Sequence, residues 1–270
     1  MGERTPRAQA ADNAAVPLPL ENPSAQVSRW RLGTALWLLG MPGVVAVVWA
    51  LLPPLRSHEA LLPLPLWAIV LLSGLQTAVL LGLAVAVGVW LAPRVGLRAP
   101  AVSAWLAGAS AGPALWAQCK PGVWGGLAGA AWLLALSSVA PVALQPSDAG
   151  SAVPLVVKLL YGGITEELLV RWGLMTLLLW LVWRTAQRGQ GRPAAATLAT
   201  AVLVSAVIFA LGHLPAAHAM AGELTLAVVA FVLVGNTAFG VLAGWLYARH
   251  GLEAAAIAHV LAHLASHPLL

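Results

Sequence analysis

The sequence predicts an all-α membrane protein, a polytopic bundle of seven to eight transmembrane helices. Three observations point to this fold class. Of the 270 residues, 60% are hydrophobic and only 9% are charged, whereas a soluble domain carries about 25% charged residues. The apolar residues gather in runs of about 20, the helix length that crosses roughly 30 Å of hydrocarbon. Short breaks rich in proline, glycine and arginine separate these runs.

The first 31 residues are polar and rich in proline and alanine. They lack the apolar stretch of a signal peptide, so we expect a disordered tail over 1–31. The rest of the chain is expected to be one helical bundle in two parts. N-terminal transmembrane helices occupy 32–150, and the second part, 151–270, carries most of the ionisable residues that lie within apolar runs.

Seven apolar runs are long enough to be spans, and the residues at their ends are typical of the ends of membrane helices. Tryptophans bracket the first two and close the fourth, as expected for indole rings that prefer the headgroup level. Pro53-Pro54 is expected to end the first run, and polar or proline-containing loops end several of the others. The expected spans are 32–52, 66–92, 121–144, 152–183, 195–214, 223–247 and 251–267.

The apolar segment 101–118 is rich in small residues and is broken by Pro113, so it is either an eighth span or an irregular, interfacial or re-entrant piece. If it does not cross, nearly every basic residue falls on one side of the membrane, with Arg56 alone on the other. That is a strong positive-inside pattern with a cytoplasmic N-terminus. If it crosses, the arginine cluster 184–192 moves outside. We therefore favour seven full spans plus this irregular piece.

The 14 basic and 9 acidic side chains give a net charge of +5. Because the basic residues lie between apolar runs, they are interpreted as topology determinants, and no nucleic-acid partner is expected. Cys119 is the only cysteine, which excludes an internal disulfide and a cysteine zinc cage. The excess of arginine over lysine and the abundance of alanine suggest a bacterial source. We expect a multi-pass protein of the bacterial inner membrane.

Ionisable groups at bilayer depth are costly and are rarely present without a partner or a function. The longest run places Glu166, Glu167 and Arg171 near its middle. Glu167 and Arg171 are four residues apart and share a helix face, so a buried packing pair is one interpretation. Glu166 is rotated by about 100° from Glu167, and that interpretation leaves it without a partner.

Histidines mark the next span and the last one. His213 stands late in its span, where a hydrogen-bonded core histidine is the simpler interpretation. His259 and His263 are four residues apart, so their rings can address one ion, one oxyanion or each other. An interfacial histidine stripe is the alternative, and we prefer it for His267.

The order and spacing of these motifs resemble the CPBP (Abi) intramembrane proteases, related to type II CAAX prenyl endopeptidases. The motifs are EExxxR at 166–171, FxxxH at 209–213 and HxxxH at 259–263. The resemblance covers about 151–267 and implies that 151–270 is a CPBP-like catalytic transmembrane core. It implies an intramembrane endopeptidase that hydrolyses a peptide bond of a membrane-associated peptide, either prenylated or a precursor. The expected partners are thus the lipid bilayer and that peptide substrate.

The resemblance also implies a role for each motif. Glu166 and His213 would activate a water molecule, while Glu167 and Arg171 would brace the site. His259 and the residue at 263 would stabilise the oxyanion. The family usually has asparagine at this last position, whereas this chain has a histidine, and a neutral imidazole can still donate one hydrogen bond.

A metal-assisted mechanism is the alternative to metal-free hydrolysis. One glutamate and three histidines are a plausible zinc set, because zinc accepts nitrogen and oxygen ligands and lowers the pKa of bound water to about 7. No cofactor is certain, and zinc is the candidate. The ligands would be Glu166, His213, His259 and His263.

Two other function classes remain open from the residues alone. A transporter of protons or metal ions also uses glutamates and histidines at membrane depth, although the spans 32–52 and 66–92 hold few polar residues. A non-catalytic membrane scaffold or immunity protein could keep the same fold. The side on which a site would open is also undecided. Seven spans place His213 and His263 nearer the outer ends of their helices, and an eighth span over 101–118 reverses this.

Overall fold

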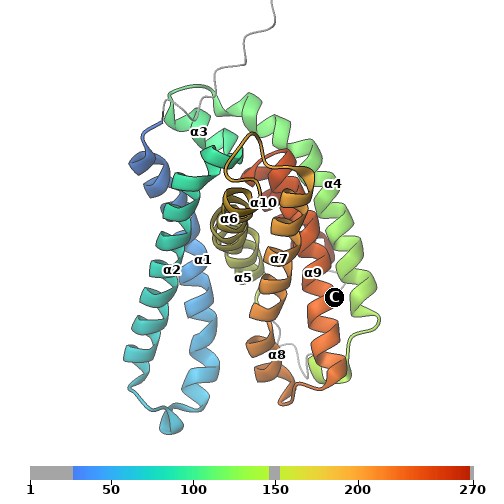
Figure 1. Ribbon diagram of the computed structural model, residues 1–270. Helices are drawn as coiled ribbons and strands as arrows, with labels where there is room; N and C mark the ends of the chain where they lie inside the picture. The colour runs from blue at the N-terminus through green and yellow to red at the C-terminus, as the bar shows by residue number, and fades with distance from the viewer. Residues whose placement is uncertain (1–26, 146–152, 268–270) are drawn as a thin grey trace, which may run out of the picture.

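A computed structural model describes residues 27–145 and 153–267, and every regular element in these two ranges is helical (Figure 1). The predicted all-α fold class is thus confirmed for the described residues. Residues 1–26 of the predicted tail lie outside them. The first helix begins at Arg29, three residues before the predicted start of the first span.

Helices α1 (Arg29–Ser57) and α2 (Leu66–Val95) form an antiparallel pair, joined through the short helix η2 (Glu59–Leu61). The guanidinium of Arg29 lies 4.3 Å from the ring centre of Trp90, near the end of α2. The expected break at Pro53-Pro54 is wrong, because α1 continues through both prolines. They lie in its last turns, and the helix runs on to Ser57 although each proline removes one helical N–H donor.

The segment 101–118 does not form a span of its own. It contains most of α3 (Pro100–Leu106), a turn, and the beginning of α4 (Ala111–Ser137). Pro113 stands in the first turn of α4, where a backbone N–H would have no helical partner in any case. The carboxylate of Glu253 accepts hydrogen bonds from the backbone N–H groups of Ala101 and Val102, which ties α3 to the last helix. The segment is thus irregular in its helical structure, and its not crossing the membrane stays a prediction.

The central element is a continuous helix of 32 residues. Its middle has π-type hydrogen bonding. This arrangement is rare in proteins, and where it occurs it is often part of a functional site. The hydroxyl of Thr165 donates to the carbonyl of Gly40 at 2.7 Å, which anchors this helix to α1. Its parts are α5 (Leu155–Val157), η4 (Lys158–Thr165), η5 (Glu167–Met175) and α6 (Thr176–Ala186), with Glu166 between η4 and η5.

The remaining helices surround the central one on the side away from α2 (Figure 1). Helix α10 packs on α4 and η4, and α7 packs on α9. Glycines of α4 permit the close approach of α10, since a Cβ at Gly126 would lie 2.5 Å from Cβ of Leu261. The elements are η3 (Val142–Leu144), α7 (Ala195–Gly212), α8 (Leu214–Ala221), α9 (Leu226–Arg249) and α10 (Leu252–Ser266).

Among the residues that the structure describes, five helices are long and apolar enough to cross a membrane, so the protein is an integral membrane protein. They are α1, α2, the central helix, α7 continued by α8, and α9. The predicted count of seven to eight stays a prediction, because α4 is not among the five and α10 is shorter. The N–H of Leu252 donates to the carbonyl of Arg98, so the basic loops before α3 and before α10 meet at one end of the bundle.

Candidate active site

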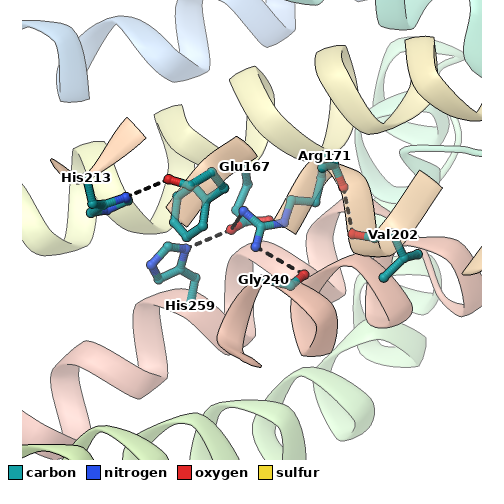
Figure 2. A network of polar contacts seen from close by, with 8 residues as sticks. Glu167, Arg171, Val202, His213, Gly240 and His259 are labelled. Atoms are coloured by element: carbon teal, nitrogen blue, oxygen red, sulfur yellow. Dashed lines mark hydrogen bonds and ion pairs between the residues drawn. The ribbon is translucent and has the colours of Figure 1, made fainter. Parts of the chain in front are cut away.

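Glu167 is the centre of a buried polar cluster between the central helix and α10 (Figure 2). Its Oε1 lies 2.7 Å from Nδ1 of His259 and 3.2 Å from a guanidinium nitrogen of Arg171. The side chains are 1% exposed for Glu167 and Arg171 and 5% for His259. The predicted pair of Glu167 and Arg171 is confirmed, and the structure adds His259 from α10 as a second partner of the carboxylate.

Arg171 connects this cluster to two further helices. Its guanidinium donates to the backbone carbonyl of Gly240 on α9 at 3.4 Å, and its Cζ lies 4.8 Å from the ring centre of Phe209 on α7. A buried charge is tolerated only when it is paired and hydrogen-bonded. Arg171 therefore holds η5, α7 and α9 in a fixed relation around Glu167.

His213 directly follows the last residue of α7 and is half-buried. Its Nδ1 lies 2.8 Å from the carbonyl oxygen of Phe209. A carbonyl can only accept, so Nδ1 carries the hydrogen, and Nε2 of the neutral ring is left with a free lone pair. The ring also packs edge-on against Phe209, with 4.5 Å between the centres. His213 can accordingly accept a proton or a hydrogen bond through Nε2.

His259 and His263 stack on each other along one face of α10. Their ring centres are 5.0 Å apart and their planes are 30° apart, and the other neighbour of His259 is Phe239 at 4.6 Å. The expected alignment of the two rings is confirmed. Both Nε2 atoms face Gly162 of η4, where an added Cβ would lie 3.4 Å from Nε2 of His263 and 3.7 Å from that of His259. The two nitrogens therefore converge on one small space.

Glu166 differs from its neighbour Glu167 in its surroundings. Its side chain is half-buried, whereas that of Glu167 is fully buried. It follows Gly162 by four residues, so both positions lie on the same side of the helix. Glu166 therefore stands on the side of the helix that carries Gly162, one turn further along.

Lys158 and His213 belong to the same neighbourhood. Together with His259 they are the charged or titratable groups that act electrostatically on His263. Lys158 precedes Gly162 by four residues and is half-buried. A cation and two further imidazoles thus act on His263, and its surroundings favour negative charge.

The donor set does not fit a ready-made zinc site. In the two described ranges of the chain, no three His, Cys, Asp or Glu side chains are grouped so as to hold a metal ion. Zinc requires three or four ligand atoms at about 2.0–2.2 Å around one point. The set formed by Glu166, His213, His259 and His263 is therefore not assembled for zinc here.

Sequence patterns alone did not assign a part in the site to Gly162, Phe239 or Gly240. Gly162 has a weak signal, since it stands one turn before Glu166 in a helix interior, where glycine is unfavourable. The contacts of Phe239 and Gly240 with the site cannot be predicted from the local sequence, because they depend on how α9 is rotated toward α10 and η5.

An apolar cavity of about 1090 Å³ lies beside the cluster. Helices α1, α3 and α10 and one face of the central helix form its walls. Trp30 and Arg31 stand at the beginning of α1, and Glu167 is the polar residue that the cavity shares with the cluster. A largely apolar cavity with a few polar groups is the usual form of a ligand site.

One family comparison gives a match. The family model described as "Type II CAAX prenyl endopeptidase Rce1-like" matches residues 148–265. Among the curated proteins there is no match, and none among the solved structures. The matched stretch contains the two glutamates, the arginine and all three histidines of the predicted motifs. Residues 148–265 thus form a domain of the CPBP (CAAX-protease-like) type.

Proposed function

We propose that the protein is an intramembrane endopeptidase, which cleaves a membrane-associated peptide with a water molecule activated by Glu166 and His213. One observation carries this proposal. The Nε2 atoms of His259 and His263 converge on a single space beside Gly162, and Glu166 projects from the same helix face one turn away. The glutamate and the imidazoles all lie inside the segment that matches the protease family.

Glu166 is the proposed general base. It is half-buried, so a water molecule can reach it, unlike the fully enclosed Glu167. The water oxygen adds to the carbonyl carbon of the substrate as its proton passes to the Glu166 carboxylate. The electron pair of the C=O bond moves onto oxygen. Collapse of this tetrahedral intermediate breaks the C–N bond, and the proton held by Glu166 goes to the departing amine.

His213 is the proposed partner of Glu166 in orienting the water. Its Nδ1–H is held by the carbonyl of Phe209 at 2.8 Å, so its free Nε2 can accept a hydrogen bond from the water. A fixed tautomer and a fixed ring orientation lower the cost of reaching the reactive geometry.

His259 and His263 are the proposed oxyanion donors. Nδ1–H of His259 is already donated to Glu167 at 2.7 Å, so Nε2 of this ring donates only when the ring is protonated. The ionised carboxylate of Glu167 stabilises that imidazolium. His263 can donate from Nε2 as a neutral ring. The brace formed by Glu167 and Arg171 thereby acts on the oxyanion through His259.

The adjoining cavity supports a substrate with a hydrocarbon group. It holds about 1090 Å³, and Glu167 is among the residues that line it. Apolar walls favour a lipid chain or an apolar peptide side chain, because burial is favourable by about 25 cal/mol per Å². A lipidated or strongly apolar membrane peptide, prenylated or a precursor, is the proposed substrate class.

Cleavage by protein purified in detergent tests the proposal. The substrates are a prenylated peptide, the same peptide without the prenyl group, and a library of apolar peptides. Glu166→Gln and His213→Ala are compared with Glu223→Gln and His218→Ala, which change the same residue types at exposed positions. We expect the two site variants to lose cleavage by about 10²–10⁴-fold and the two control variants to retain it. Equal cleavage by all five proteins, the unchanged chain included, contradicts the assignment.

A further inference from the structure

We propose that Gly162 is a positioning residue that keeps open the space in which the oxyanion forms. This inference rests on the proposed function. The three atoms nearest to a Cβ built at Gly162 all belong to His259 and His263, and two of them are the Nε2 atoms. A side chain here would therefore project between the donor nitrogens and the rest of the site.

Helix packing does not require a glycine at this position. A Cβ at Gly162 would meet its neighbours at 3.4–3.7 Å, which is ordinary van der Waals contact. The next residue, Gly163, contrasts with it, since a Cβ there would overlap Val260 of α10. Gly162 also has no left-handed backbone conformation that would call for glycine.

Glycine in a helix interior is less stable than alanine. Neither packing nor backbone geometry accounts for this choice at Gly162, and its surroundings indicate a functional reason. An oxygen that accepts hydrogen bonds from both imidazoles must lie about 2.7–3.1 Å from each donor. The methyl group of an alanine would occupy the same small space, at 3.4 Å and 3.7 Å from those two nitrogens.

The expected defect is specific to the transition state. The apolar cavity lies on another face of the central helix, lined by Leu160, Ile164 and Leu168, so a methyl group at Gly162 leaves it intact. Substrate binding should therefore persist, whereas the negative charge that develops in the transition state should no longer be stabilised by the two imidazoles. A loss confined to the transition state lowers kcat and leaves KM nearly unchanged.

Gly162→Ala and a matched control, Gly74→Ala, provide the test. The control adds the same methyl group on α2, 3.7 Å from a side-chain carbon of Val48 and remote from the histidines. For Gly162→Ala we expect kcat to fall by about 10²–10³-fold, the range for loss of an oxyanion donor. KM should change little and Tm should be equal or higher. For Gly74→Ala we expect kcat and KM as in the unchanged protein.

A second measurement does not depend on activity. Diethyl pyrocarbonate modifies accessible imidazole nitrogens, and mass spectrometry gives the rate at each histidine. The added methyl group should slow modification of His263 at least several-fold relative to the exposed His218, and Gly74→Ala should not. Unchanged kcat in Gly162→Ala, or unchanged modification of His263, overturns the inference. If the unchanged protein cleaves no peptide, the proposed function fails separately, and the modification rates still decide whether Gly162 controls access to the imidazoles.

Discussion

Glu166 and Glu167 are adjacent in the chain, yet the same change of glutamate to glutamine should affect a different property of the protein at each position. Glu167 is fully buried and contacts both Arg171 and His259. Glu166 is half-buried and is the proposed base. We expect Glu167→Gln to lower stability strongly and Glu166→Gln to remove cleavage with little effect on stability.

The contacts of Glu167 determine how far the Glu167→Gln change should lower stability. Its carboxylate is paired with Arg171 at 3.2 Å, and both side chains are 1% exposed. Removing one partner of a buried ion pair costs about 3–5 kcal/mol, because the other charge is left uncompensated. At about 2–4 °C per kcal/mol for a chain of this size, Tm should fall by about 6–20 °C. The amide also ceases to stabilise a protonated His259.

The assay compares the unchanged protein and both variants in one detergent. Thermal unfolding followed by intrinsic tryptophan fluorescence gives Tm, and cleavage is measured well below the lowest Tm. For Glu166→Gln we expect Tm within about 2 °C of the unchanged protein, since changes away from buried partners are usually within about 0.5 kcal/mol. Its cleavage rate should fall by about 10²–10⁴-fold.

Two results would refute this reasoning. Equal Tm values for Glu167→Gln and the unchanged protein would mean that the buried pair does not brace the site. A fall in Tm for Glu166→Gln as large as that for Glu167→Gln would mean that Glu166 is a structural residue, and its loss of cleavage would then carry no chemical meaning.

The other predictions concern the cavity, the metal, the packing and the topology. Leu39→Trp, on the cavity wall, should raise KM for a lipidated peptide several-fold, whereas Leu71→Trp, on the exposed face of α2, should leave it unchanged. Treatment with a chelator should leave cleavage unchanged, since the described residues assemble no group of three metal ligands; a loss restored by zinc would contradict this. Gly88→Ala should lower stability by about 1–3 kcal/mol in thermal unfolding, because the new Cβ overlaps the ring of Trp172; an unchanged Tm would speak against that packing. A reporter fused after residue 190 should be active in the cytoplasm, like one at the N-terminus. Activity on the outer side would mean that the segment 101–118 crosses the membrane as an eighth span.

The membrane class and the all-helical fold followed from the sequence because both depend on local properties. The length of an apolar run decides whether a helix can cross a bilayer, and no contact between helices is needed to count it. The same holds for the pair Glu167 and Arg171 and for the pair His259 and His263. Residues four apart on one helix must be neighbours, wherever that helix packs.

Local rules were less successful at the ends of helices. The expected stop at Pro53-Pro54 is wrong, because α1 continues through both prolines to Ser57 despite the two N–H donors that they remove. The irregular character of 101–118 was predicted from Pro113 and small residues, but its division into α3 and the start of α4 was not. That division depends on Glu253, which lies about 150 residues away and caps α3 through two backbone N–H groups.

The sequence by itself determined which ionisable groups lie within apolar helices and in which order. Only the tertiary structure decided what each one faces. The contact between Glu167 and His259 joins residues 92 positions apart, and the convergence of two imidazoles beside Gly162 depends on how far α10 is rotated and how deeply it lies against η4. Rotation and depth of a helix are set by close packing of many side chains at once, so no spacing rule within a single helix contains them.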